Sequence, residues 1–232
     1  MDELVCQGRQ IGVIMNKKYI LFDLDGTLTD PEEGITKSLQ HALSFIDIKV
    51  EDRSILKRHI GPPLADGLRE FFGLDDGQIE EVIGHFREYF VDKGIFMNYK
   101  YEGIEELLDS LVKAGKTLIV ATSKPEVLAE RILKHFNLDQ YFTDICGSNL
   151  DETRSKKGEV IAYALEENGI KEKEQVVMIG DRLHDILGAK ENDIASIGVL
   201  YGFGSREEHV KAGADRIAAD LKELEDILLE RG

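Results

Sequence analysis

Two aspartates separated by one residue are the first sign of chemistry in this sequence. Asp23 and Asp25 belong to the segment DLDGTLTD, which directly follows the apolar run Tyr19–Phe22. Residues i and i+2 of an extended chain point to the same side, so both carboxylates should project together where the run ends. Carboxylates that close require a cation or a shared proton, and Gly26 permits a sharp turn after them. The segment therefore indicates a catalytic or metal-binding site, or else an Asp- and Gly-rich turn that merely ends a strand.

A second acidic segment, GDRLHD, follows another apolar run much later in the chain. Its Asp181 and Asp185 are four residues apart, so they share a face if a helix begins there. The alternative is that these acids only cap and stabilise the start of that helix.

Two polar pairs complete the set of candidate residues. Thr122 and Ser123 follow the apolar run Thr117–Ala121, and taken alone they indicate an N-cap for a helix beginning at Pro125. Lys156-Lys157 precedes a stripe of apolar residues at helical spacing. A lysine pair on its own is usually solvated, so its interpretation depends on the other segments.

The elements that must position these residues alternate along the chain. Continuous apolar runs bounded by polar residues or glycine favour strands of a parallel sheet covered on both faces, and helical periods fall between them. The sequence therefore predicts an α/β fold with a doubly wound parallel sheet. The four runs are Tyr19–Phe22, Thr117–Ala121, Val176–Ile179 and Ala195–Leu200.

The carboxyl ends of parallel strands lie on one edge of a sheet, so the candidate residues should converge there. Asp23, Asp25, Asp181 and Asp185 would then bring four carboxylates together. Such a concentration requires a hard cation with oxygen ligands, and Mg²⁺ fits because it combines a few carboxylates with substrate phosphate. Lys157 would offset a further negative charge.

The stretch from 31 to 98 breaks the alternation, because it has helical stripes and no convincing strand run. We interpret it as an all-helical insertion over the strand ends, where it would act as a lid. The expected organisation is an N-terminal extension at 1–15, a catalytic core at 16–31 and 98–232, and a helical cap at 32–97.

Composition excludes several classes of partner. The 232 residues contain 29 Lys and Arg against 45 Asp and Glu, and 29 − 45 gives the formal net charge of −16. An acidic surface repels nucleic acid and anionic membranes, so we expect neither as a partner. Two cysteines cannot form the disulfide framework of a secreted protein, and the N-terminal apolar run is too short for a signal peptide or a membrane span. A cytoplasmic location is expected.

The four segments, in this order, resemble the motifs of the haloacid dehalogenase (HAD) superfamily of phosphohydrolases. The resemblance covers residues 17–232, including a helical cap inserted after the first motif. Further segments resemble the phosphoglycolate phosphatase or 5′-nucleotidase branch, with a leaning to the nucleotidase-like group. These segments are TDP, HIGPPL, TSKP, GDR and YGFGS.

The resemblance implies a Mg²⁺-dependent phosphomonoester hydrolase. Asp23 would attack phosphorus and form an aspartyl-phosphate, while Asp25 would protonate the leaving alkoxide and then take a proton from water. Mg²⁺ would be held by Asp23, the Asp25 carbonyl and Asp181, with Asp185 orienting a bound water or ligand.

The remaining roles implied by the resemblance concern the substrate. Thr122, Ser123 and Lys157 would bind phosphoryl oxygens, with Lys156 as the alternative to Lys157. Substrate choice should come from the cap, where Arg58 in the basic run Lys57-Arg58-His59 is one candidate and Arg69 is another, unless this is only a solvated face. Lys124 and Arg182 flank core motifs and are expected either to touch substrate or to bind the cap.

Several functions remain open from the sequence. The expected substrate is a small phosphorylated metabolite, best a nucleoside 5′-monophosphate, and the expected protein is a monomer or homodimer. Phosphoglycolate hydrolysis is the alternative, and a sugar phosphate mutase is less favoured. A signalling receiver domain also combines an Asp cluster with Thr or Ser and Lys, but it is about half this length. A catalytically silent binding protein is disfavoured because every acidic motif position is present.

Overall fold

The computed structural model describes residue 14 and residues 17–61, 64–151 and 153–231. The extension expected at 1–15 lies outside the described residues except for Ile14, which is buried against the main core. Pro62 and Pro63 also lie outside them.

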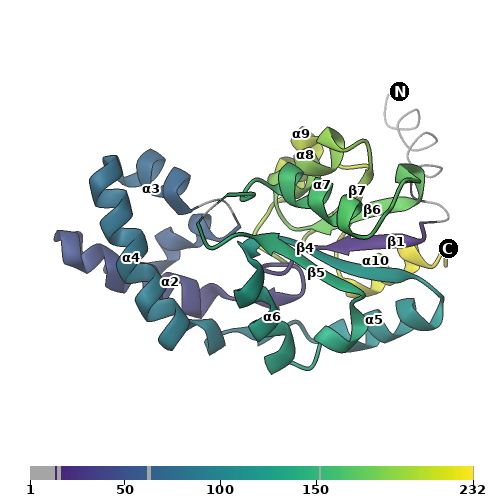
Figure 1. The fold of residues 1–232 in the computed structure, drawn as a ribbon, viewed down its shortest axis with the longest axis horizontal. Coiled ribbons are helices and arrows are strands. Elements are labelled where there is room, and N and C mark those ends of the chain that lie inside the picture. Colours follow the sequence, from purple (N-terminus) through teal and green to yellow (C-terminus); the bar gives the residue numbers. More distant parts are fainter. Residues whose placement is uncertain (1–13, 15–16, 62–63, 152, 232) are drawn as a thin grey trace.

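A six-stranded parallel sheet lies at the centre of the fold, with the strand order β5-β4-β1-β6-β7-β8 (Figure 1). The predicted α/β fold is confirmed, and the four inner strands are the four apolar runs. The two edge strands, β5 and β8, were not predicted. The strands are β1 (Tyr19–Phe22), β4 (Thr117–Pro125), β5 (Asp144–Ser148), β6 (Val176–Gly180), β7 (Ala195–Val199) and β8 (Arg216–Ala218).

Helices cover both faces of this sheet, which explains why its inner strands are apolar on both sides. Alternate residues of β1 point to opposite layers: Ile20 and Phe22 pack in one core and Leu21 in the other. Full burial of such a side chain contributes about 1.5–3 kcal/mol. Figure 1 shows α7, α8 and α9 on one face and α5, α6 and α10 on the other. These helices are α5 (Ile104–Lys113), α6 (Glu126–His135), α7 (Lys157–Glu167), α8 (Leu183–Glu191), α9 (Arg206–Ala212) and α10 (Leu221–Leu228).

The chain leaves the sheet after β1 and returns before α5 through a two-stranded antiparallel ribbon. In this ribbon Thr29 of β2 (Thr29–Asp30) pairs with Lys100 of β3 (Tyr99–Lys100). The described segments between them form helices with an apolar core of their own, which includes Leu39, Leu68 and Val82. The helices are α2 (Glu32–Leu43), η1 (Ser44–Ile46), η2 (Arg53–His59), α3 (Leu64–Phe72), α4 (Asp76–Asp92) and η3 (Gly94–Phe96). α2, α3 and α4 lie together to one side of the sheet (Figure 1).

One local prediction is wrong. Thr122 and Ser123 do not cap α6, because Pro125 occupies the N-cap position and no side chain caps that helix. Instead β4 continues through both residues, and its pairing with β5 is irregular between Ala121 and Pro125. The irregularity leaves this stretch available to a cavity at the strand ends. Within the described part of the chain, no helix combines the length and apolar character needed to cross a membrane.

Candidate active site

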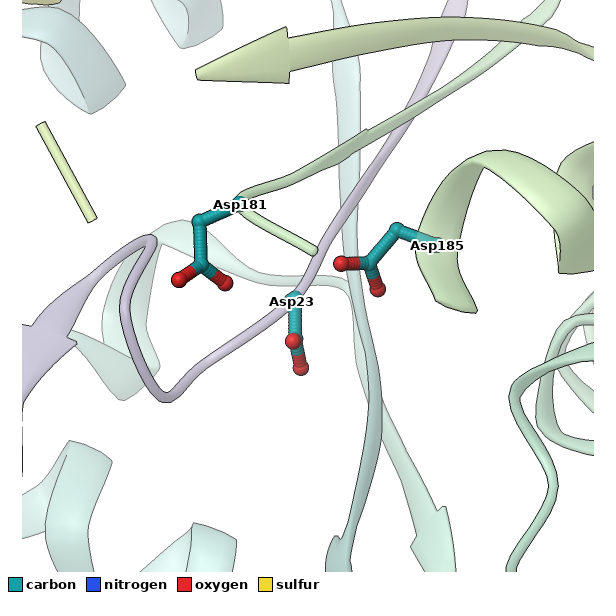
Figure 2. Close-up of side chains that lie close together, drawn as sticks. All are labelled: Asp23, Asp181 and Asp185. Carbon is teal, nitrogen blue, oxygen red and sulfur yellow. The ribbon is translucent and has the colours of Figure 1, made fainter. Parts of the chain in front are cut away.

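Three aspartates meet where β1 and β6 end. Asp23 follows β1, Asp181 follows β6, and Asp185 lies in the first turn of α8. Each brings one carboxylate oxygen to within 4.8 Å of the others, and all three side chains are buried (Figure 2). Residues from distant parts of the sequence therefore converge at one point, as the parallel sheet requires.

Two glycines allow the carboxylates to approach the backbone this closely. Gly26 has a φ of +84°, and a Cβ atom there would lie 2.2 Å from Asp181 Oδ2. At Gly180 a Cβ atom would lie 2.1 Å from the Asp185 carboxyl carbon. A side chain at either position would displace a carboxylate of the cluster.

Backbone amides fix the orientation of these carboxylates. Leu24 N donates to Asp23 Oδ1 at 2.8 Å, and Phe203 N donates to Asp181 Oδ2 at 2.7 Å. Arg182 N donates to Asp185 Oδ2 at 3.1 Å. Burial is the main cause that raises the pKa of Asp181 well above its ordinary value, and the negative charges of Asp185 and Asp23 raise it further.

Lys157 supplies the positive charge within the cluster. Its Nζ lies 2.8 Å from Asp23 Oδ1 and 2.9 Å from Asp185 Oδ1, and it donates to the Ala121 carbonyl at 3.1 Å. Burial alone would lower the pKa of Lys157, but the two carboxylates outweigh it and raise that pKa. Lys156, at the N-cap of α7, is exposed.

Asp25 forms a separate ion pair with Lys124. Lys124 Nζ lies 2.6 Å from Asp25 Oδ2, and the side chains are 7% and 11% exposed. Burial raises the pKa of Asp25, although Lys124 acts in the opposite direction. Asp25 Oδ1 is buried without a hydrogen-bond partner among the described residues, so one oxygen of this carboxylate remains available.

The donor set fits a divalent cation. Asp23, Asp181 and Asp185 carry three negative charges and Lys157 carries one positive charge, so the group has a net charge of −2 when ionised. Asp181 Oδ1 is buried and lacks a hydrogen-bond partner within the described residues, which is costly unless an ion or a proton satisfies it. Hard carboxylate oxygens are the ligands that Mg²⁺ prefers.

A cavity of about 210 Å³ opens beside the cluster, between the core and the helical insertion. Asp23 and Asp25 line it, together with Thr122, Ser123 and Lys124 from β4. Thr122 is 2% exposed, and its hydroxyl accepts a hydrogen bond from Lys124 N at 3.3 Å. The cavity thus joins the carboxylates to hydroxyl groups that suit phosphoryl oxygens.

Three of the expected substrate residues, Arg58, Arg69 and Arg182, do not line this cavity, and Arg69 pairs with Asp76. Arg58 stacks on Phe71, with its guanidinium carbon 3.4 Å from the ring centroid. Arg182 instead joins core to insertion: its Nη1 donates to the Ile60 carbonyl at 2.7 Å, and its Nε pairs with Glu208 at 3.0 Å. Of the two expectations for Arg182, contact with the cap therefore matches its hydrogen bonds.

Sequence reasoning missed other residues of the cavity wall. Phe86 and Arg87 of α4 line it, as do Ser148 and Leu150 at the end of β5. Phe86 shares its helical spacing with the buried residues Val82 and Phe90 of α4, and this spacing is the same for a cavity wall and for a core face. Ser148 follows an edge strand that the sequence did not reveal.

A doubly wound sheet with a buried carboxylate cluster, a lysine and hydroxyl groups at its carboxyl edge defines a phosphoryl-transfer enzyme. Residues 20–199 match the family model described as haloacid dehalogenase-like hydrolase. The chain belongs to this family and is a phosphatase that acts on phosphorylated substrates, as the resemblance predicted.

Individual relatives cover nearly the whole chain. A Pseudomonas aeruginosa protein named 5′-nucleotidase is 47% identical over 209 residues, which cover 90% of this chain and 94% of the relative. The Mycobacterium tuberculosis tyrosine-protein kinase PtkA is 38% identical over 91% of this chain and 72% of its own length. The crystal structure of a predicted phosphatase from Clostridium acetobutylicum superposes with a TM-score of 0.90 at 49% identity, covering 92% of this chain and 99% of that one.

Proposed function

We propose that this phosphatase is a Mg²⁺-dependent phosphomonoester hydrolase that works through an aspartyl-phosphate on Asp23. The observation that carries the proposal is the position of the Asp23 carboxylate. It lies within 4.8 Å of Asp181 and Asp185, 2.8 Å from Lys157, and on the wall of the cavity. A carboxylate in that position can meet a phosphoryl group entering from the cavity.

Asp23, Asp181, Asp185 and the backbone carbonyl of Asp25 would hold the Mg²⁺ ion. When bound, Mg²⁺ neutralises charge on the carboxylates and on the transferring phosphoryl group. The net charge of −2 on the ionised cluster and the unpartnered Asp181 Oδ1 support this assignment.

In the first chemical step, an Asp23 carboxylate oxygen attacks phosphorus in line and the ester oxygen leaves. Asp25, which lines the same cavity, gives its proton to that leaving oxygen. In the second step Asp25 takes a proton from water, which attacks the aspartyl-phosphate and releases inorganic phosphate. Asp25 serves both steps because losing its proton in the first prepares it for the second.

Thr122, Ser123 and Lys157 would bind the phosphoryl oxygens during both steps. Thr122 and Ser123 line the cavity, and Lys157 Nζ lies against the attacking carboxylate. Hydrogen bonds and positive charge aimed at these oxygens stabilise the charge that spreads over them in the transition state.

The proposed substrate is a nucleoside 5′-monophosphate, and residues 32–97 would act as the cap that helps to select it. The relative named 5′-nucleotidase and the largely apolar wall of the cavity support this choice. Phosphoglycolate is the second candidate, because a relative at 26% identity is named phosphoglycolate phosphatase and because Lys124 and Arg87 line the same cavity.

The test is a steady-state screen of nucleoside 5′-monophosphates, phosphoglycolate, hexose phosphates and an aryl phosphate, with Mg²⁺ or with EDTA. We expect turnover that requires Mg²⁺ and is fastest with nucleotides. Asp23→Asn should abolish turnover with a melting temperature that stays equal or rises, because one of three crowded carboxylates becomes neutral. Equal turnover by wild type and Asp23→Asn would exclude Asp23 as the nucleophile, and nucleotides no faster than the aryl phosphate would exclude the nucleotidase assignment.

A further inference from the structure

Across the sheet, the described cavity wall extends from Asp23 toward β4 and β5. In the sheet, β1 lies between β4 and β6, and the candidate metal ligands Asp181 and Asp185 follow β6. Among the described residues, the cavity wall includes the β4 stretch and Ser148 at the end of β5, but none from β6, β7 or β8. A substrate whose phosphoryl group lies at Asp23 therefore has its leaving group over β4 and β5.

This direction sets the reach of the leaving group. Neighbouring strands are about 4.8 Å apart, so β5 lies about 10 Å from β1 across the sheet. A two-carbon leaving group ends above β4, whereas the ribose and base of a nucleotide extend to β5. The cavity continues to β5, as its lining by Ser148 and Leu150 shows.

The cavity has one apolar wall from the insertion and another from the core. Phe86 and Phe90, one turn apart on α4, line the first wall with parallel rings whose centroids are 5.4 Å apart. Leu128 and Leu150 line the second wall. Leu150 is 57% exposed, so a large apolar side chain stands open to solvent beside the cavity.

The cavity wall also carries a polar side chain where β5 ends. Ser148 is only 3% exposed and lines the cavity. A serine hydroxyl both donates and accepts hydrogen bonds, so it can bind a sugar hydroxyl of the substrate. The wall thus combines flat apolar surface with one hydroxyl contact.

We propose that the part of the cavity beside the end of β5 is a nucleobase subsite, in which the base lies between Phe86 of the cap and Leu150 of the core while Ser148 binds the ribose. The proposal rests on the phosphomonoesterase function above. Apolar side chains offer no hydrogen bonds to base edges, so purines and pyrimidines should both be accepted. The base, and not only the phosphate, then contributes to binding.

The experiment compares kcat/KM for AMP and CMP with that for ribose 5-phosphate, which lacks the base. Wild type should prefer both nucleotides by about 10-fold or more, as expected from stacking on each base. Leu150→Ser and Phe86→Ala should each reduce this preference by about 5-fold or more, mainly through KM. Leu150→Ser is the more secure variant. The leucine side chain is largely exposed, so removing it should not disturb folding.

Two matched variants serve as controls. Val210→Ser replaces an exposed aliphatic residue of α9, and Phe45→Ala replaces an exposed aromatic residue of the insertion; neither residue lines the cavity. Both should retain the wild-type preference. Three outcomes would overturn the subsite alone. They are equal kcat/KM values for ribose 5-phosphate and the nucleotides, an equal loss of kcat/KM on all substrates in Leu150→Ser, and a strong preference of wild type for one base. Absence of Asp23-dependent turnover with every substrate would overturn the phosphatase mechanism itself.

Discussion

Lys157 offers the sharpest test of the carboxylate cluster, because it is the cation between two buried acids. Its side chain is 4% exposed and contacts both Asp23 and Asp185 within 2.9 Å. Lys157→Met keeps most of the apolar volume and removes the charge. Breaking a buried ion pair by removing one partner costs about 3–5 kcal/mol, because the remaining charge is left uncompensated.

This cost converts to a measurable shift in melting temperature. In a chain of this length, 1 kcal/mol corresponds to about 2–4 °C, so Lys157→Met should lower the melting temperature by about 6–20 °C. The measurement is thermal and urea unfolding of wild type and variant in EDTA, with turnover measured separately in Mg²⁺. Turnover should also be lost, because Lys157 lies against the proposed nucleophile.

Lys156→Met is the matched control. Lys156 is the neighbouring residue and is exposed, so the variant makes the same change in net charge and should alter stability by less than about 0.5 kcal/mol. It also tests the sequence alternative in which Lys156 binds phosphate. Equal destabilisation by the two variants would refute the reasoning, since the effect would then reflect net charge and not the buried pair.

Three further predictions concern metal binding, pH and the contact between cap and core. Mg²⁺ at 100 times its Kd should increase the free energy of unfolding of wild type by about 2.7 kcal/mol and so raise its melting temperature. The rise should be much smaller in Asp181→Asn, and equal rises in a thermal melt would contradict the assignment of Asp181 as a metal ligand. Burial, followed by Arg58, lowers the pKa of His59 to about 4 from an ordinary value of 6.5. The unfolded chain therefore binds a proton more readily as pH falls, and the folded state should lose about 2 kcal/mol of stability between pH 7 and pH 5 in urea unfolding, a loss that His59→Gln should abolish. Arg182→Met removes the hydrogen bond from the core to the Ile60 carbonyl of the cap. Because the cap helps to bind substrate, losing this charge-assisted hydrogen bond should raise KM about 10-fold. An unchanged KM would show that this contact does not hold the cap.

The inner part of the sheet could be predicted from sequence because its strands are buried on both faces. Such strands are largely apolar, as are β1, β6, the first part of β4 up to Ala121 and, apart from Ser196, β7. The edge strands carry a weaker signal. β5 contains Asp144, Gly147 and Ser148, and β8 has only three residues, so neither forms an apolar run.

The residues of the candidate site also fall into a part that the sequence predicts and a part that it does not. Asp23, Asp25 and Asp181 could be expected to gather because the direction of parallel strands places their ends on one edge. The partners of long side chains could not be predicted. Arg58 stacks on Phe71 and Lys124 pairs with Asp25, and each contact depends on packing between elements that no local pattern records. The roles assigned to these residues stay predictions.

Asp185 shows why two interpretations of one sequence pattern need not exclude each other. Its Oδ2 accepts the Arg182 amide and so caps the start of α8, while its Oδ1 pairs with Lys157 inside the cluster. The capping bond holds the side chain in one orientation, and Gly180 leaves the space that this orientation requires. A carboxylate fixed in this way loses little conformational freedom when it binds an ion. The acidic segment after β6 is therefore both a helix start and part of the candidate metal site, and the first role prepares the second.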